Sequence, residues 1–274
     1  MARKITFPRL LSILFMVFLS IIALFPFYCM LIMGTYNIND LVKGIHLLPG
    51  KYIAHNWKTL FTVPILTYYK NSILVAVASM SLCVFISTMC GYGIAKYDFK
   101  GKKALNAVIM VTLLIPTQLS LIALVIEMRK LGLTGTLWPI ILPNGASAFG
   151  VYWIISYSGK AVPDEVMESG RIDGCTEFRI FWNLSIPFMK PAIITLCLLS
   201  FLWAWNALLT PMVLISRQKL FTLPLGIKAL STGFRNDYGA QILGLSVGTV
   251  PILFLFSFFS KNLISGLSGV AVKG

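Results

Sequence analysis

Six apolar runs, each about 18 to 24 residues long, dominate the 274-residue chain. An α-helix needs about 20 apolar residues to cross the roughly 30 Å of hydrocarbon in a bilayer, so each run is long enough to span a membrane. Only 12% of the residues are charged and the mean hydropathy is +0.84, which excludes an ordinary water-soluble domain. The sequence therefore predicts an all-α integral membrane protein with six transmembrane helices, at residues 10–33, 72–95, 105–126, 137–157, 192–215 and 242–259.

The orientation of these spans is predicted from the basic residues. The first run follows three basic residues but is longer than the core of a signal peptide, and no small-residue cleavage site ends it, so we expect a retained helix. An even number of spans places both termini on one side. The short loop after the second span carries three lysines between Lys100 and Lys103, which favours the cytoplasm for that side. The bias is small overall, with 13 basic residues on the predicted inner side and 10 on the outer side.

The net charge of +14 and the cysteine pattern exclude several classes of site. The basic residues lie between the apolar runs and not in one stripe, which indicates anchoring to lipid headgroups and disfavours nucleic-acid binding. The five cysteines are odd in number, show no CxxC spacing and mostly lie inside apolar runs, so we interpret them as core residues. The two histidines, His46 and His55, share one loop without a cysteine ligand, and we expect no metal site.

Prolines and polar side chains recur inside the predicted spans, notably Pro116 with Gln118, Trp205 with Asn206, and Pro251. An unsatisfied backbone group is costly in hydrocarbon. These residues therefore indicate either helix kinks satisfied by neighbouring helices or a polar path through the bundle, and both interpretations stay open.

The loop between the fourth and fifth runs, residues 162–191, carries five of the nine acidic residues of the chain. Pro163 followed by two acids is typical of a helix N-terminus, where carboxylates meet the positive end of the helix dipole. Asp173-Gly174 predicts a turn, because glycine tolerates a positive φ. The loop is therefore expected to begin with a short helix that ends at this turn.

A second helix is predicted directly after the turn. Thr176 is a suitable N-cap for a helix that ends ahead of Pro187. Phe178, Phe181 and Trp182 recur at spacings of three and four, which places an apolar face on one side of this helix. So short a helix pair is not stable alone in water, so the face must dock on the other helices of the chain or on a second protein.

The sequence around this turn resembles a known motif. Residues Glu168-Ser-Gly-Arg-Ile-Asp-Gly-Cys175, with Pro187 and Pro191 beyond them, resemble the EAA motif (E-A-A-x-x-D-G-A) of permease subunits of ABC importers. The resemblance is strongest to the carbohydrate-uptake subfamily that includes the maltose-transporter permeases. Further elements of that subfamily occur in order: Asn71-Ser72, Tyr97 to Gly101, Leu131 to Leu133, Trp205-Asn206, Phe221 to Pro224, and the tail from Gly266 to Gly274.

The resemblance implies the type I ABC importer permease fold, also described as MetI-like, and a non-catalytic subunit. In that family the loop forms a coupling helix that sits in a cleft of a cytoplasmic ATPase, whose closure moves the membrane helices. Small residues replace the alanines of the motif, as close docking requires, although Gly170 softens the helix by up to about 1 kcal/mol. Ala207 stands where the family often has an acid. Matched by position, the ATPase-coupling residues are Glu168, Ser169, Gly170, Asp173, Gly174, Cys175 and Pro187.

Partners and localisation also follow from the resemblance: a homologous second permease, two cytoplasmic ATPase subunits and an extracellular solute-binding protein that delivers the sugar. None of the Gly-Lys pairs is followed by Ser or Thr, so the chain has no Walker A loop. ATP and magnesium are therefore expected on the ATPase subunits, with no cofactor in this chain. In a prokaryotic inner membrane we expect a cytoplasmic segment and first helix (1–34), an extracellular loop (35–71), a permease core (72–264) containing the coupling loop (162–191), and a cytoplasmic tail (265–274).

The expected function is the ATP-driven import of a carbohydrate, an oligosaccharide or a glycoside. Sugars are bound through hydrogen bonds and through stacking on aromatic faces. Tryptophan is equally typical of a contact with a partner permease or of the membrane interface, so these alternatives stay open for each candidate. The candidates along the substrate path are Trp203, Trp205 and Asn206 in the fifth run, with Asn144 and Tyr152 around the fourth.

Two alternative functions share part of this pattern. An ABC importer permease for a solute other than a sugar keeps every feature of the coupling loop. An ion-coupled secondary transporter usually buries an ionisable residue within a span, whereas all nine acids here are predicted in loops or at span ends. The sequence therefore favours the ABC importer.

Overall fold

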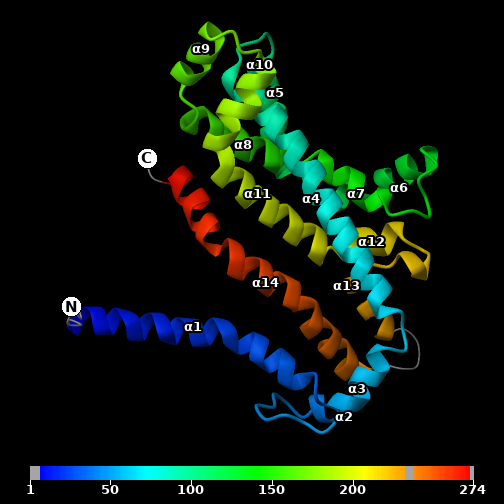
Figure 1. Ribbon diagram of the computed structural model, residues 1–274. Helices are drawn as coiled ribbons and strands as arrows, with labels where there is room; N and C mark the ends of the chain where they lie inside the picture. Colours follow the sequence, from blue (N-terminus) through cyan, green and yellow to red (C-terminus); the bar gives the residue numbers. More distant parts are fainter. Residues whose placement is uncertain (1–6, 232–236, 272–274) are drawn as a thin grey trace. The chain divides into compact units, whose positions relative to one another are not determined.

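The computed structural model describes residues 7–231 and 237–271, and the regular structure in this part of the chain is entirely helical. The chain divides into two compact units, residues 1–65 with 226–250 (unit 1) and residues 66–225 with 251–274 (unit 2), and each is described by itself. Figure 1 follows the helices along the chain. Arg3, Lys4, Arg235 and the last three residues of the predicted tail lie outside the described residues.

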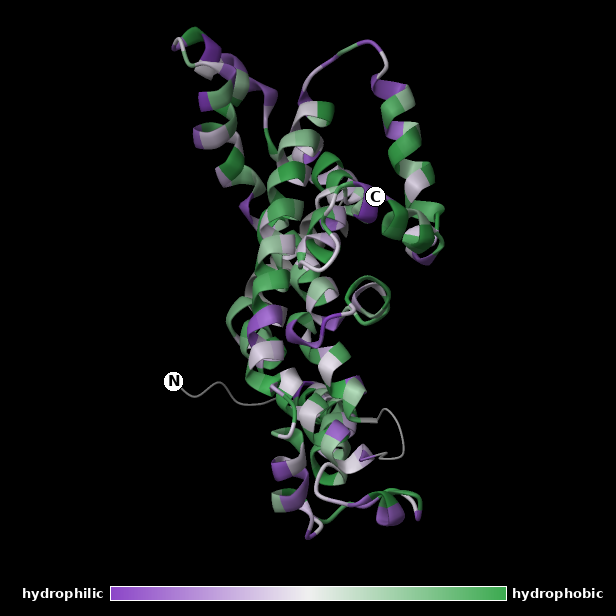
Figure 2. Cartoon of the chain, turned by 90° about the vertical axis from the view of Figure 1, so that its right-hand side faces the viewer, coloured by the Kyte–Doolittle hydropathy of each residue, from purple (hydrophilic) through white to green (hydrophobic). Residues whose placement is uncertain are grey.

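Within the described residues, four helices are long and apolar enough to cross a membrane. They match the first, second, fifth and sixth predicted spans. Hydrophobic residues predominate along the long helices, and hydrophilic residues gather at helix ends and in loops (Figure 2). The four are α1 (Phe7–Met33), α4 (Ile65–Lys96), a helix at Glu177–Asn206 made of α10 (Glu177–Arg179), η3 (Ile180–Ser185) and α11 (Ile186–Asn206), and α14 (Tyr238–Ala271), whose apolar part ends at Phe259.

The third predicted span is broken. Helix α5 (Lys102–Leu114) is followed, after Ile115 and Pro116, by η1 (Thr117–Ser120) and α6 (Leu121–Lys130), which turn away by 94°. A residue before proline is pushed out of the helical region, and Ile115 accordingly has φ −84° and ψ 120°. If this bent pair is one span, the described residues contain five spans.

The fourth predicted span, residues 137–157, is not one helix, and the predicted count of six is not confirmed. The apolar run holds three short pieces: α7 (Trp138–Ile141), η2 (Leu142–Gly145) and α8 (Ala148–Ala161). Helix α8 has 14 residues, about 21 Å of rise, which is too short to cross the hydrocarbon. Ser147 begins α8 as its N-cap by accepting a hydrogen bond from the Gly150 N–H at 3.1 Å.

A buried asparagine on α3 (Ile53–Leu60) links segments of unit 1. Asn56 is fully buried, and its Nδ2 donates to the carbonyl oxygens of Gly34 at 2.8 Å and Tyr36 at 2.9 Å. A Cβ on Gly239 would collide with the Tyr36 carbonyl oxygen and approach the Asn56 amide, so only glycine fits there. Asn56 thus joins α3, the chain after α1 and the start of α14. The apolar stretch of α1 has no buried residue, as expected for a helix in lipid.

Unit 2 contains the main core, where α4 packs closely against α8. A Cβ on Gly91 would lie 2.6 Å from the Ile154 Cβ, so the backbones approach because glycine leaves room. The Trp153 indole N–H donates to the Ala192 carbonyl oxygen at 3.0 Å and joins α8 to α11. The buried members of this core are Cys83, Tyr92, Ile154, Val162, Met167, Ile180, Phe181, Met189, Ala192 and Leu196.

Shorter helices connect these elements. Those not yet named are α2 (Ile38–Leu41), α9 (Asp164–Ile172), α12 (Leu209–Leu214), η4 (Gln218–Leu220), α13 (Leu223–Lys228) and η5 (Ala229–Ser231).

Candidate functional site: the coupling loop and a polar cavity

The helix-turn-helix predicted in the coupling loop is present (Figure 1). Helix α9 begins directly after Pro163 with two acids in its first turn. Gly174 ends it with φ +75°, and the N–H of Cys175 donates to the Gly170 carbonyl oxygen at 2.9 Å, which closes the turn as a Schellman motif. Thr176 caps the next helix through its Oγ1, which accepts from the Arg179 N–H at 3.4 Å. These local predictions are confirmed.

The predicted end of the second helix ahead of Pro187 is wrong. The helix continues through Pro187 and Pro191 to Asn206, and it passes through the π-helical turn η3 immediately before Pro187. In that turn the Ile186 N–H donates to the Phe181 carbonyl oxygen five residues earlier. Pro187 lies in the first turn of α11, where the missing proline N–H does little harm.

One part of the apolar face of this second helix is buried within unit 2, and another part is exposed. Ile180 and Phe181 are buried against Tyr92, Met167 and other residues of the unit 2 core. Phe178 is 66% exposed and Ile172, at the end of α9, is 86% exposed. The sequence left open whether the chain itself or a second protein covers this face. The chain covers one part, and the other part is left facing outward.

Gly170 lies where α9 packs on η3. A Cβ at this position would be 2.8 Å from the Leu184 Cδ1 and 3.1 Å from the Ile180 Cγ1. A small residue is therefore required for close packing of the two helices. The other motif residues lie outward: Glu168, Ser169, Asp173, Gly174 and Pro187 are exposed, and Cys175 is half-buried.

Glu177 connects the coupling loop to the end of α4. Its carboxylate accepts from Arg171 Nε at 2.6 Å, from Arg171 Nη2 at 3.3 Å and from the Tyr97 hydroxyl at 2.5 Å. The hydrogen bonds from Arg171 and then Tyr97 hold the pKa of Glu177 below its ordinary value, and Glu177 raises the pKa of Arg171. Burial, and then the bond to Glu177, raises the pKa of the Tyr97 hydroxyl well above its ordinary range.

A second connection joins α9 to the last residue of α4. The Lys96 Nζ donates to Asp164 Oδ1 at 2.7 Å and to the Val162 carbonyl oxygen at 2.5 Å, and only 5% of the lysine side chain is exposed. The hydrogen bond from Lys96 lowers the pKa of Asp164. The sequence did not predict these partners, since Lys96 and Tyr97 are more than 60 residues from Asp164 and Glu177 along the chain. The two connections fix the loop to α4.

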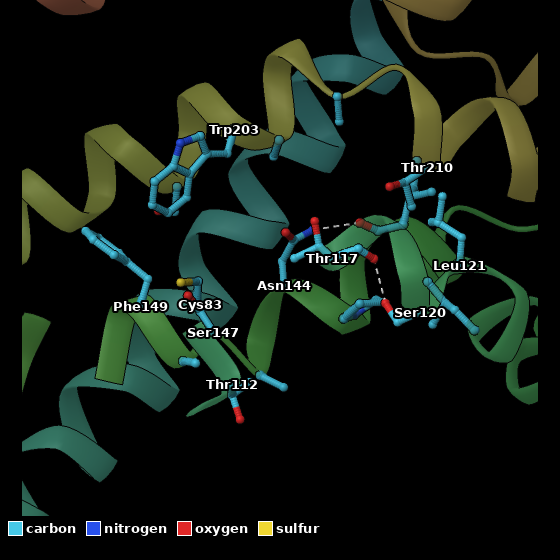
Figure 3. A pocket seen from close by; sticks show the side chains of 18 of the residues that line it. Cys83, Thr112, Thr117, Ser120, Leu121, Asn144, Ser147, Phe149, Trp203 and Thr210 are labelled. Atoms are coloured by element: carbon cyan, nitrogen blue, oxygen red, sulfur yellow. Dashed lines mark hydrogen bonds between the residues drawn. The ribbon is translucent and has the colours of Figure 1, made fainter. Parts of the chain in front are cut away.

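Unit 2 also contains a cavity of about 690 Å³ between α4, the bent α5–α6 pair, the start of α8, α11 and α12 (Figure 3). Of the described residues that line it, none is Asp, Glu, Lys, Arg or His. Trp203 and Phe149 lie at one end, with ring centroids 5.1 Å apart, and Thr117, Ser120 and Thr210 lie toward the other. The polar side chains on its wall are Thr112, Thr117, Ser120, Asn144, Ser147, Ser200 and Thr210, beside the thiol of Cys83.

The structure brings two of the five candidate substrate-path residues to this cavity. Trp203 is about half exposed. Asn144 is held on its wall because its Nδ2 donates to the Ile140 carbonyl oxygen at 2.8 Å and to the Ser79 Oγ at 3.1 Å. Ala207, where the family often has an acid, also lines the cavity.

The other three candidates do not line the cavity. Trp205 is 2% exposed and packs on Phe201 and Tyr69, with ring centroids 5.7 Å and 5.5 Å apart. Asn206 is exposed, and its Nδ2 donates to the Leu202 carbonyl oxygen at 3.0 Å. Tyr152 is 39% exposed on α8. Thr117 and Ser120, which follow the bend at Pro116, also line the cavity with their hydroxyl groups, and the sequence did not predict them there.

The comparison with protein families agrees with this architecture. A family model described as the binding-protein-dependent transport system inner membrane component matches residues 83–268, about two thirds of the chain. The chain belongs to this family. Both the resemblance based on the EAA-like segment and the predicted all-α permease fold are confirmed, and the chain is a non-catalytic, multi-pass permease subunit.

Several curated relatives align with this permease over almost their whole length. It is 34% identical to the arabinooligosaccharides transport system permease protein of Halalkalibacterium halodurans, with 94% of each chain covered. It is 32% identical to the protein of the same name in Bacillus subtilis, over 97% of this chain and 96% of that one. It is 27% identical to the lactose transport system permease protein of Rhizobium radiobacter, with 91% of each covered.

A solved structure has the same fold. A chain in the crystal structure of a bacterial ABC transporter involved in the import of the acidic polysaccharide alginate superposes with a TM-score of 0.76, over 95% of this chain and 98% of that chain. The two sequences are 19% identical. The similarity supports the permease fold.

Proposed function

We propose that this chain is the membrane-spanning subunit of an ATP-driven importer for a neutral carbohydrate, an oligosaccharide or a glycoside. Transport is supported by the family, and the curated relatives named for arabinooligosaccharides and lactose support a sugar. The observation that carries the substrate class is the cavity in unit 2.

The chemistry of this cavity suits an uncharged polyol. A sugar offers many hydroxyl groups that both donate and accept hydrogen bonds, and the wall supplies six serine or threonine hydroxyls and the Asn144 amide. Trp203 offers an aromatic face for the apolar face of a sugar ring. With no carboxylate, ammonium, guanidinium or imidazole among the described lining residues, an ionic substrate would be desolvated without compensation. The volume of about 690 Å³ lies within the range of about 300 to 1,000 Å³ that is usual for ligand pockets.

The coupling loop is proposed to dock on a separate ATPase. Ile172 and Phe178 form its exposed apolar contact, and Glu168, Ser169, Asp173 and Gly174 surround it with small or polar groups. Gly170, Cys175 and Pro187 shape the loop. Two ATPase subunits would bind ATP and magnesium, a homologous permease would complete the membrane channel, and a solute-binding protein would deliver the sugar from outside. Both termini of this chain would then lie in the cytoplasm.

Sugar uptake by the whole transport complex tests the proposal. The complex, purified through a tag on this chain, is reconstituted in liposomes loaded with ATP, and uptake of neutral and acidic oligosaccharides and of an amino acid is compared. We expect uptake of a neutral sugar that vanadate blocks. Uptake of the amino acid alone, or uptake driven by an ion gradient without ATP, would refute the proposal.

A pair of tryptophan variants then tests the cavity. Trp203→Ala removes the aromatic face and should raise the half-saturating sugar concentration about tenfold, since such an aromatic contact contributes about 1 kcal/mol or slightly more. Trp138→Ala is the matched control, because Trp138 is similarly exposed but does not line the cavity. Equal effects of the two substitutions would remove Trp203 from the substrate path.

A further inference from the structure

Five exposed basic residues lie at the end of unit 2 that is remote from the coupling loop. The coupling loop is fixed to Lys96 at the end of α4, whereas Lys70 lies near the start of this helix. At a rise of 1.5 Å per residue, the two positions are about 39 Å apart, which exceeds the thickness of the hydrocarbon. We name the five residues the outer basic surface: Lys70 on α4, Arg129 and Lys130 at the end of α6, and Arg217 and Lys219 in and beside η4.

Contacts within unit 2 join the segment of Arg217 and Lys219 to the start of α4 and to the loop that follows α6. The Asn71 Nδ2, next to Lys70, donates to the carbonyl oxygens of Lys219 at 2.9 Å and Phe221 at 3.0 Å. The Arg217 guanidinium lies against Gly135 in the loop after α6, where a Cβ would be 3.1 Å from the Arg217 Cζ. Gly135 has φ +78° and carries no side chain, so the guanidinium rests directly on the loop backbone.

The charges of this surface are not neutralised within the described part of unit 2. No ion pair found there includes any of the five residues, whereas Lys96 and Arg171 at the coupling loop are paired with Asp164 and Glu177. Glu127 is the acid nearest along the chain to Arg129 and Lys130. Membrane topology does not explain this excess of positive charge, because basic residues are favoured on the cytoplasmic side and this end lies opposite the coupling loop.

We propose that the outer basic surface is a docking site for an acidic surface of the extracellular solute-binding protein. This inference rests on the proposed function, which places the coupling loop in the cytoplasm and this surface outside. Clustered unpaired charges of one sign steer an oppositely charged partner and raise its association rate. A planar guanidinium binds carboxylates through two parallel hydrogen bonds, and the exposed Arg217 guanidinium lies against the loop backbone at Gly135.

A folded protein fits this surface better than lipid headgroups do. The segment that carries Arg217 and Lys219 is held by two hydrogen bonds from Asn71, and a fixed arrangement of charges suits a partner of fixed shape. Headgroup anchoring needs only long, mobile basic side chains near the interface. Anionic lipid is therefore the competing outcome of the test.

The test measures binding of the purified solute-binding protein of the same transport system to the whole complex in nanodiscs of zwitterionic phosphatidylcholine. In the double variant Arg217→Glu, Lys219→Glu, we expect the rate constant for association of the solute-binding protein at low salt to fall at least tenfold. The dissociation rate constant should change little. At about 0.5 M salt the difference should shrink to less than about twofold, because screening shortens the range of the charges. Arg217→Gln with Lys219→Gln, which only neutralises the charges, should give an intermediate loss.

Lys100→Glu with Lys103→Glu is the matched control, since it makes the same change in charge at exposed positions beyond the other end of α4. An equal loss in this control, or unchanged association in the Arg217 and Lys219 variants at low salt, overturns the inference. It is also overturned if those variants change only the binding of the complex to vesicles that contain phosphatidylglycerol. Sugar uptake by the wild-type complex is measured in parallel. If uptake occurs while the charge reversals leave partner binding unchanged, only this inference fails, whereas absence of ATP-driven uptake counts against the proposed function.

Discussion

Replacing Gly170 by leucine should detach the coupling loop from the permease core. A Cβ at residue 170 would already lie 2.8 Å from the Leu184 Cδ1 and 3.1 Å from the Ile180 Cγ1. An alanine can be accepted if the end of the Leu184 side chain moves, and alanine favours a helix over glycine by about 1 kcal/mol, so Gly170→Ala should be close to neutral. Leucine adds three further carbon atoms to a filled space, and such overpacking costs about 1 to 3 kcal/mol.

The matched control is Gly159→Leu on α8. Gly159 also lies within a helix, but a Cβ there meets nothing within 4 Å, so the gain in helix propensity should remain. We expect Gly170→Leu to lower the midpoint of thermal unfolding of the purified permease by several degrees. The amount of ATPase subunit that co-purifies with the permease should fall at least tenfold. Gly159→Leu should retain both.

Three results would refute this reasoning. Normal ATPase recovery with Gly170→Leu would show that α9 does not need its close packing on η3. A strong loss in Gly170→Ala would show that the contact with Leu184 cannot relax. Equal losses in Gly170→Leu and Gly159→Leu would indicate a general effect of leucine on folding. Membrane insertion is followed in each variant by the yield of the extracted chain.

Further predictions concern the same loop. The double variant Glu168→Lys, Asp173→Lys should abolish sugar uptake and reduce the amount of ATPase subunit that co-purifies with the permease, because both carboxylates are exposed. Membrane insertion should be unchanged. Normal uptake in vesicles would contradict the role assigned to these two residues. Gly174→Val forces a β-branched residue to φ +75°, which costs about 1 to 2 kcal/mol or more, and should reduce ATPase recovery as well. Arg171 lowers the pKa of Glu177, so the stability from this contact is fully present above the ordinary pKa of 4.5 and is lost as the pH falls through the lower pKa of the folded state. The midpoint of thermal unfolding, measured between pH 7 and pH 3, should therefore fall less with pH in Glu177→Gln than in the wild type. The same pH dependence in both proteins would argue against a contribution of this contact.

Short-range signals predicted the start and the turn of the coupling loop correctly. Proline before two acids, glycine after a helix and threonine as an N-cap each act within a few residues of the chain, so the surrounding fold does not override them. The end predicted ahead of Pro187 failed for a related reason. Pro187 lies in the first turn of α11, where a proline is tolerated, and the π-helical turn η3 joins α10 to α11 ahead of it.

The fourth predicted span shows a different limit. Hydropathy reports that residues 137–157 are apolar, but it does not report whether one helix runs through them. Pro143 and Gly145 interrupt the run. Gly145 lies so close to α4 that a Cβ would be 2.9 Å from the Leu82 side chain, so the interruption is packed into unit 2. The resulting break leaves Asn144 and Ser147 on the wall of the cavity.

The sequence by itself determined that the chain is helical and lies in a membrane, and that one loop carries an ABC importer coupling motif, because hydropathy and turn chemistry act locally. Only the tertiary structure decided which side chains meet at the cavity. Trp203 and Trp205 are two residues apart on α11, about 200° around the helix axis, so one faces the cavity while the other packs on Phe201 and Tyr69. Which of the two faces inward depends on the neighbours of α11, and these come from segments distant in the chain.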